Sequence, residues 1–377
     1  MNKTFLIVII LVLGIKAGAQ TPALVADSLY ARGNYAKAIK YYQNADPTVE
    51  SILKIAKAYD ALGNYKLALD YFQKGVELYP DDDLLLYQYA LLLKKTKKWQ
   101  EALDTFNELI KRDSLNPNYH YQQGLTRESL IDTLAQKSFK KAFELDSTHQ
   151  KAIYKIAKMY LQRKQHDSVL HYVDIGLSAY QENTELINLK ALSYYWDMDY
   201  RKAIPYFETL LELGETSLHI YEKLSYSYDY ISNREKAIEF QQIAVSINPK
   251  NADNIYILGK LYYENREYEK AEVEFKEALE LMDEPLDSEY IQLALNYNRQ
   301  RKYPESIETL KKALKENPTN DTAHFFLLNT KTAYYANLDT KIKLHEDFLE
   351  KFPKSSYVPF VKRLLSNLKE EKFMKGE

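Results

Sequence analysis

The 377-residue chain contains no cysteine. It therefore has no disulfide, no thiolate metal ligand, no cysteine nucleophile and no cysteine to carry a lipid anchor at a signal cleavage site. Glycine and proline are scarce, at 10 and 11 residues, which argues against a turn-rich β fold. Basic and acidic residues nearly balance, 51 against 53, so no strong field of one sign favours nucleic acid or anionic lipid as a partner.

After its first twenty residues the sequence lacks apolar runs of the 17 to 25 residues that a membrane helix needs. The beginning differs: Lys3 precedes an unbroken apolar run from Phe5 to Leu13, and Ala17-Gly18-Ala19 has the small-x-small form of a cleavage site. This pattern predicts a signal peptide over residues 1–19, cleaved after Ala19. The alternative is an uncleaved anchor, but the run is short and Lys16 interrupts it. We expect an exported chain, periplasmic or secreted, without a transmembrane segment in its mature part.

The sequence does contain a repeated phrase, of which "GNYKLALDYFQKGVELYP" (Gly63 to Pro80) is one copy. A small residue marks the middle of each copy, and successive markers lie 30, 34, 33, 34, 34, 34, 34 and 35 residues apart. The markers are Ala38, Ala68, Ala102, Ala135, Val169, Ala203, Ala237, Ala271 and Ser306. A period near 34 residues predicts an array of one supersecondary unit.

Each copy has helical periodicity. A large residue follows most markers by four places and a small or aliphatic residue by seven, as in Ala68, Phe72 and Gly75, so the three lie on one helix face. A second stripe precedes the marker by twelve and nine places, as at Ala191 and Tyr194. The polar segment between the stripes has room for a tight turn only. Each period is therefore predicted to be a helix hairpin.

The small residues are expected to let the two helices approach closely, with the aromatic residue filling the space beside the contact. A larger side chain at Ala203 or Ala271 should then overpack the hairpin and cost about 1 to 3 kcal/mol of stability. Irregularities are expected where the pattern breaks: at the short junction near Pro47, in the shortened fourth repeat, and at Pro205, which falls inside a second helix.

This pattern of small, aromatic and proline positions resembles the tetratricopeptide repeat, a helix-turn-helix unit of 34 residues. The resemblance extends over residues 22–353 and includes a degenerate tenth unit near Asp321–Pro353. It implies an all-α fold, a right-handed α-solenoid (superhelix) of about nine to ten units over residues 20–354. Within residues 355–377, an apolar stripe predicts a C-terminal capping helix, formed by Val361, Leu364, Leu365 and Leu368.

The sequence gives no catalytic, cofactor or metal signature, so no enzyme is predicted. The glycines have no phosphate-binding spacing, and the 7 histidines are scattered. The acidic run Asp81 to Asp83 is expected to cap a helix rather than bind calcium. The basic cluster Lys94, Lys95, Lys97 and Lys98 is expected to be a solvated turn rather than a polyanion site.

In tetratricopeptide repeats the first helix of each hairpin lines a concave groove, and the resemblance implies which residues do so here. They are Tyr87, Tyr121, Tyr154, Lys158, Tyr195, Trp196, Glu222, Tyr226, Tyr230, Tyr256, Lys260 and Tyr263. Rigid aromatic rings are favoured where a protein binds another chain. The leading hypothesis is a non-enzymatic scaffold of the cell envelope that binds a partner protein or an extended peptide. For these tyrosines, packing between neighbouring repeats is the alternative.

A carbohydrate or cell-wall binding module is the alternative function, in which the same rings stack on sugars. Sugar binding also requires polar side chains around the rings, and only Asn188, Asp229 and Asn298 are placed for that. One subtype of the family binds a terminal carboxylate through a fixed Lys and Asn set. The matching positions here are mostly Tyr, Leu or acidic, so this specificity is not supported.

Overall fold

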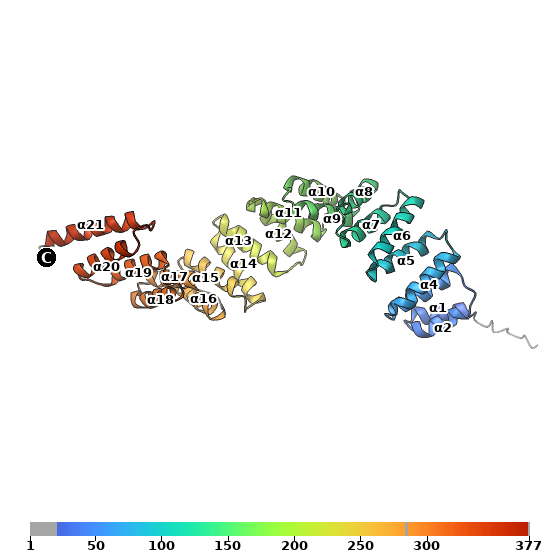
Figure 1. Cartoon of the computed structure of the whole chain (residues 1–377), viewed down its shortest axis with the longest axis horizontal. Coiled ribbons are helices and arrows are strands. Elements are labelled where there is room, and N and C mark those ends of the chain that lie inside the picture. Colours follow the sequence, from blue (N-terminus) through green and yellow to red (C-terminus); the bar gives the residue numbers. More distant parts are fainter. Residues whose placement is uncertain (1–20, 283–285, 376–377) are drawn as a thin grey trace, which may run out of the picture. The chain divides into compact units, whose positions relative to one another are not determined.

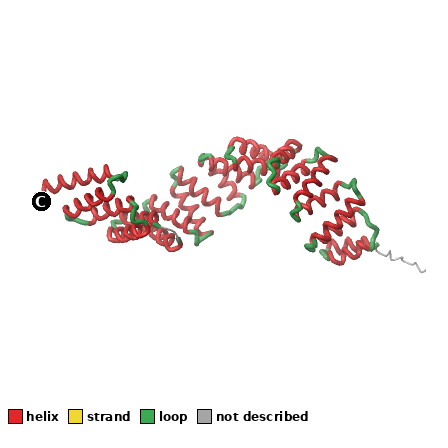
Figure 2. The backbone as a smooth tube through the Cα atoms, in the orientation of Figure 1, coloured by secondary structure: helices red, strands yellow, loops and turns green. Residues whose placement is uncertain are grey.

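The computed structural model describes residues 21–282 and 286–375, so the predicted signal peptide lies outside the described residues. Within those ranges the chain forms helices joined by short turns, and no strand (Figures 1 and 2). The predicted all-α fold is confirmed. None of the described helices combines the length and the hydropathy that crossing a membrane demands.

The helices come in pairs, one pair for each sequence period. Their bounds are α1 Pro22–Ala31, α2 Tyr35–Gln43, α3 Val49–Ala61, α4 Tyr65–Leu78, α5 Asp83–Lys95, α6 Trp99–Arg112, α7 Pro117–Ser129, α8 Ala135–Leu145, α9 Gln150–Gln162, α10 His166–Ala179, α11 Thr184–Trp196, α12 Tyr200–Glu212, α13 Leu218–Tyr230, α14 Arg234–Ile247, α15 Ala252–Glu264, α16 Tyr268–Leu281, α17 Asp287–Arg299, α18 Tyr303–Glu316, α19 Asp321–Tyr334, α20 Leu338–Lys351 and α21 Val358–Lys375.

The described chain divides into two compact units. The first takes the described residues up to Arg163 together with His171–Ala179, and the second takes Lys164–Leu170 and the described residues from Tyr180 onward. In the first unit α1 packs on α2, α3 on α4, α5 on α6 and α7 on α8, and each pair packs on the next. The second unit repeats this arrangement from α11 to α20, with α21 packed on α20.

The repeated stripe forms the core of each hairpin. All nine marker residues are buried, and so are the residues four places after them, from Tyr42 to Leu310. The close approach predicted for the small positions is visible at two glycines of first helices. A Cβ added to Gly259 would lie 2.8 Å from the ring of Phe275, and one added to Gly124 would lie 2.6 Å from the ring of Phe139.

One repeat replaces the aromatic residue of this stripe with a buried amide. Gln241 in α14 is 1% exposed, and its side-chain nitrogen donates to the backbone oxygen of Asn254 at 2.9 Å. Asn254 in turn donates to the carboxylate of Glu222 at 2.8 Å. These hydrogen bonds satisfy polar groups that would otherwise be costly to bury, and they connect α13, α14 and α15.

In the nine hairpins from α1–α2 to α17–α18, the turn between the helices holds one residue in the left-handed backbone region. The first two repeats use glycine there, Gly33 and Gly63. The next seven use other residues, with φ between 56° and 65°: Lys97, Ile131, Lys164, Met198, Ser232, Arg266 and Arg301. The geometry of the turn is therefore the same in these nine hairpins although its residue type is not.

Two of the expected irregularities shorten a second helix. α2 has 9 residues and α8 has 11, whereas α4 and α6 have 14. Pro205 lies inside α12, where the helix continues to Glu212. The residues missing from these two repeats therefore shorten the second helix, and both helix hairpins still form.

Candidate partner-binding surface

The twelve residues predicted to line a groove belong to both units. Those in the first unit lie on α5, α7 and α9, and those in the second lie on α11, α13 and α15. Their surroundings differ according to their place in the repeat, and this difference decides which of them a partner can reach.

Tyrosines three places before the small residue of a first helix pack inside their own hairpin. The rings of Tyr87, Tyr121 and Tyr256 lie 6.2, 5.8 and 5.5 Å from the phenylalanine four places after the marker in the same hairpin. Tyr121 is only 9% exposed and also contacts the ring of His149 at 5.0 Å. Burial raises the pKa of Tyr256 to about 12. These rings mainly serve the core.

Among the remaining predicted groove residues of α9 and α15, Tyr154, Lys158 and Tyr263 make local polar contacts. The ammonium of Lys158 lies 5.5 Å from the centroid of the Tyr154 ring and 3.4 Å from its hydroxyl oxygen. On α15, the hydroxyl of Tyr263 accepts a hydrogen bond from Arg299 at 3.1 Å, and Lys260 is exposed. They do not form a cluster of rings.

The tyrosines on α11 and α13 do form a cluster. We call them, together with the exposed Trp196 at the end of α11, the aromatic patch, and define it as Tyr195, Trp196, Tyr226 and Tyr230. The rings of Tyr195 and Tyr226 lie 5.9 Å apart. Trp196, Tyr226 and Tyr230 are 49, 51 and 62% exposed, well above most rings of this chain. Tyr195 is half-buried, and burial with the neighbouring hydroxyls and Glu222 raises its pKa to about 12. Its hydroxyl is therefore a neutral donor at physiological pH.

The patch rests on a residue that sequence reasoning assigned to packing alone. Tyr200, at the start of α12, is 6% exposed, and its ring lies 5.3 Å from Tyr195, 5.5 Å from Tyr226 and 4.5 Å from Tyr230. Such ring pairs add about 0.5–1.5 kcal/mol each beyond the burial of apolar area. Tyr200 thereby holds the exposed rings of Tyr226 and Tyr230 in place.

A second residue that sequence reasoning missed is Lys223. Its ammonium lies 4.5 Å from the centroid of the Tyr195 ring, and burial lowers its pKa. Lys223 follows Glu222 directly in α13, and this position next to a predicted groove residue could have indicated that Lys223 belongs to the same surface. Tyr200 gave no such signal, because its place in the repeat is the one that packing tyrosines also occupy.

The acidic run and the lysine cluster, to which the sequence analysis assigned no binding site, make contacts within the chain. Asp82 accepts a hydrogen bond from the backbone of Leu85 at 2.7 Å and so caps α5, as predicted. In the basic cluster, Lys95 pairs with Asp60 at 2.7 Å and Lys98 with Glu101 at 3.0 Å. Across residues 21–282 and 286–375 there is no group of three His, Asp or Glu side chains arranged to hold a metal ion.

Comparison with known proteins agrees with this architecture. A family model described as tetratricopeptide repeat matches residues 61–124, and a second model with the same description matches residues 218–251 and 252–281. The chain contains tetratricopeptide repeats. The second match contains α13, which carries half of the aromatic patch.

The curated relatives that share similarity with this chain are distant. It is 20% identical over 254 residues to a TPR repeat-containing protein of Methanocaldococcus jannaschii, covering 62% of this chain and 45% of the relative. It is 23% identical over 312 residues to DnaJ homolog subfamily C member 3 of Gallus gallus, covering 82% and 50%. The chain thus spans about half the length of the curated relatives it matches.

A solved structure supports the fold. The C-terminal part of a TPR repeat-containing protein from Cytophaga hutchinsonii aligns with a TM-score of 0.52 and 20% identity, over 61% of this chain and 97% of the other. At this level of identity the similarity establishes the arrangement of helices and nothing about ligands.

Proposed function

We propose that this chain is a non-enzymatic scaffold that binds an extended segment of a partner protein across the aromatic patch. Tetratricopeptide repeat proteins generally mediate protein–protein interactions. The observation that carries the proposal is the exposure of the Tyr226 and Tyr230 rings, both of which pack on the buried ring of Tyr200. Rings that are held in place lose little conformational entropy on binding, so they favour association.

The same rings could stack on a sugar, but their surroundings favour a protein partner. Of the three polar residues placed for sugar recognition, Asp229 pairs with Arg234 and Asn298 donates to Thr330 at 2.8 Å. Sugar hydroxyls would have to compete with these internal partners. A polypeptide segment can instead bury apolar area on the rings, and it needs few polar groups at fixed positions.

We further propose that the scaffold acts in the cell envelope or outside the cell. The support is the charged start, apolar run and Ala17-Gly18-Ala19 sequence within residues 1–19. The N-terminal sequence of the protein isolated from its native host tests this. A chain that begins at Gln20 is expected, and a chain that retains the apolar run contradicts the proposal.

Site-specific photocrosslinking in native cells tests the binding surface. A benzophenone amino acid in place of Tyr226 or Tyr230 is expected to give adducts of higher mass that protease digests. Val273 provides the matched control, because it is apolar and 60% exposed but lies on α16, away from the patch residues in sequence. Adducts of equal yield from Val273, or adducts removed by glycosidases and not by protease, would overturn the proposal.

A loss-of-function variant gives an independent measurement. Serine at Tyr195, Trp196, Tyr226 and Tyr230 is expected to abolish capture of the crosslinked partner while helicity by circular dichroism stays nearly unchanged. Undiminished capture by this variant would rule out the aromatic patch as the binding surface.

A further inference from the structure

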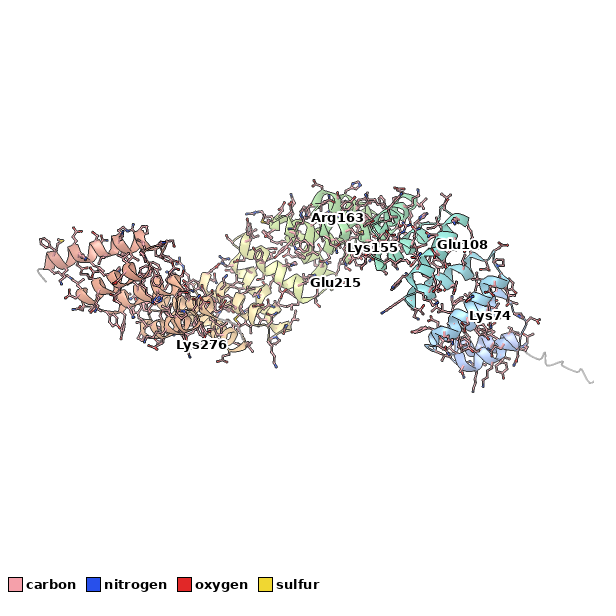
Figure 3. All side chains as sticks on the ribbon, viewed as in Figure 1. Lys74, Glu108, Lys155, Arg163, Glu215 and Lys276 are labelled. Atoms are coloured by element: carbon pink, nitrogen blue, oxygen red, sulfur yellow. The ribbon has the colours of Figure 1, made fainter. Side chains whose placement is uncertain are left out.

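The last hairpin of the second unit contains a largely apolar cavity that opens to the surface. It lies between α19 and α20, which Figure 1 labels and whose side chains Figure 3 draws. Its volume is about 190 Å³. An apolar cavity of about 150 Å³ holds a benzene molecule, so this one has room for one large apolar side chain. Its apolar walls are Leu327, Leu328, Leu344, Phe348 and Phe352.

Two bulky residues explain why this hairpin does not close. Leu328 follows Ala294 by 34 residues, so it holds the position at which the preceding first helices have a small residue. Phe348 follows Ala313 by 35 residues, at a position where the preceding second helices have a small or aliphatic residue. Bulky side chains at these positions keep two helices apart. Accordingly, α19 and α20 pack on each other less extensively than α17 and α18 do.

Two ammonium groups stand at the rim of the cavity. Lys331 belongs to the last turn of α19 and Lys351 to the last turn of α20. Neither makes an ion pair within the described residues. Asp347 is the one carboxylate among the lining residues, so positive charge exceeds negative charge at the rim.

The contacts of His324 show that Lys351 lacks an acceptor on this side. The Nε2 atom of His324 lies 3.0 Å from the backbone oxygen of Pro318 and 3.1 Å from the ammonium of Lys351. A carbonyl oxygen can only accept, so Nε2 carries the proton, donates it to Pro318 and cannot accept from Lys351. Burial, and to a lesser extent the charge of Lys351, lowers the pKa of His324, which is uncharged at neutral pH. The Lys351 ammonium is therefore available to an anion.

We propose that this cavity binds a leucine or phenylalanine side chain of a partner protein, in a segment where aspartate or glutamate flanks that residue. The apolar side chain enters the cavity, and the flanking carboxylate pairs with Lys331 and Lys351. The volume favours a single side chain, because sites that enclose whole small molecules measure about 300 to 1,000 Å³. Charge complementarity selects the acidic neighbour. The inference goes beyond the proposed function, because none of the lining residues belongs to the aromatic patch.

Peptide selection followed by a counter-screen tests the proposal. A phage-displayed library of random peptides is selected on residues 20–377, and each selected peptide is tested again on two variants. Leu344→Phe adds volume to the cavity wall and is expected to weaken binding at least tenfold. K331M/K351M keeps the apolar stems but removes both charges, and it is expected to weaken binding about two- to tenfold, the range for two exposed ion pairs. Peptides that respond to both variants are expected to carry Leu or Phe beside Asp or Glu.

A matched control separates this effect from a general loss of positive charge. K343M/K354M removes two exposed ammonium groups that do not line the cavity, and Lys343 lies on α20 as Lys351 does. This variant is expected to bind the same peptides as the parent. Thermal melting checks that the variants are folded, and Leu344→Phe is expected to melt at or above the parent temperature because it fills space. If Leu344→Phe melts early, K331M/K351M still decides, since it changes no fully buried side chain.

A titration with synthetic peptides measures the two parts of the interaction. Replacement of the leucine or phenylalanine of a selected peptide by alanine is expected to weaken binding about ten- to a hundredfold, since its burial is lost. Replacement of the flanking glutamate by glutamine is expected to weaken binding to the parent about two- to tenfold and to leave binding to K331M/K351M nearly unchanged. Fluorescence anisotropy of the labelled peptide gives each dissociation constant.

The outcomes distinguish the inference from the proposed function. Selected peptides that all bind Leu344→Phe or K331M/K351M as tightly as the parent would overturn the inference, and if they need Tyr226 and Tyr230 the proposed function stands. Self-association of the chain that Leu344→Phe abolishes in sedimentation velocity would assign the cavity to a second copy and would also overturn it. Peptides that need the cavity and both lysines support the inference even if none depends on the aromatic patch.

Discussion

The buried ring of Tyr200 lies 4.5 Å from the exposed ring of Tyr230, so a core residue of α12 supports a surface residue of α13. Tyr200 is 6% exposed and Tyr230 is 62% exposed, so replacement of each ring by serine should have unequal effects on stability. Tyr200→Ser should lower the free energy of unfolding by at least about 2 kcal/mol, because it leaves a cavity. Tyr230→Ser should lower it by less, about 0.5–1.5 kcal/mol, because the exposed ring loses its contact with Tyr200 but leaves no cavity.

Urea unfolding followed by circular dichroism measures both changes. Equal destabilisation by the two variants would contradict the distinction between a supporting and an exposed ring. A Tyr200→Phe variant, which keeps the ring, is expected to stay close to the parent in stability.

The left-handed turn residues predict a stabilising substitution. Arg266 has a φ of 65° and an exposed side chain, whereas the same turn in the second repeat uses Gly63, with a φ of 74°. Arg266→Gly should raise the free energy of unfolding by about 0.5–1 kcal/mol, since glycine adopts this conformation without a Cβ clash. Gly63→Ala should lower it by a similar amount. Shifts of the urea midpoint in the same direction for both variants would refute the argument.

The close helix approach at Gly259 predicts a coupled pair. A Cβ there would lie 2.8 Å from the ring of Phe275, so Gly259→Ala should destabilise the chain by about 1–2 kcal/mol, despite the higher helix propensity of alanine. Phe275→Leu should cost stability alone but relieve the clash when combined with Gly259→Ala. A double-mutant cycle measures this, and strictly additive effects would contradict the packing described for the pair.

A partly buried carboxylate predicts how stability depends on pH. Burial alone would raise the pKa of Glu272, but hydrogen bonds from Lys276, Lys302 and Gln300 lower it to about 2. Because the folded pKa lies below the ordinary value of 4.5, this carboxylate stabilises the fold above pH 4.5 and loses its contribution as the pH falls toward 2.

Glu272→Gln should therefore cost about 1–3 kcal/mol at pH 7, and the difference from the parent should shrink as the pH falls below 4.5. Urea titrations at several pH values measure it. Glu280→Gln, an exposed position on the same helix, is the control and should show no such pH dependence. A difference that stays constant between pH 7 and 3.5 would show that Glu272 contributes by packing and not by charge.

The sequence by itself determined the helices and their pairing. Helical periodicity is local, and nine small residues spaced about one period apart require the same hairpin each time, so Ala68, Phe72 and their counterparts were predictably buried. Capping by Asp82 followed for the same reason, because its partner, the backbone of Leu85, lies three residues away.

Only the tertiary structure decided which tyrosines a partner can reach. Tyr121 and Tyr226 both occupy positions assigned to a groove, yet one is 9% exposed and the other 51%. The position of Tyr121 points its ring at Phe139 of its own hairpin, whereas Tyr226 contacts rings of the preceding hairpin. Contacts between side chains about 30 residues apart depend on how the hairpins stack, and the local pattern of residues does not contain that information.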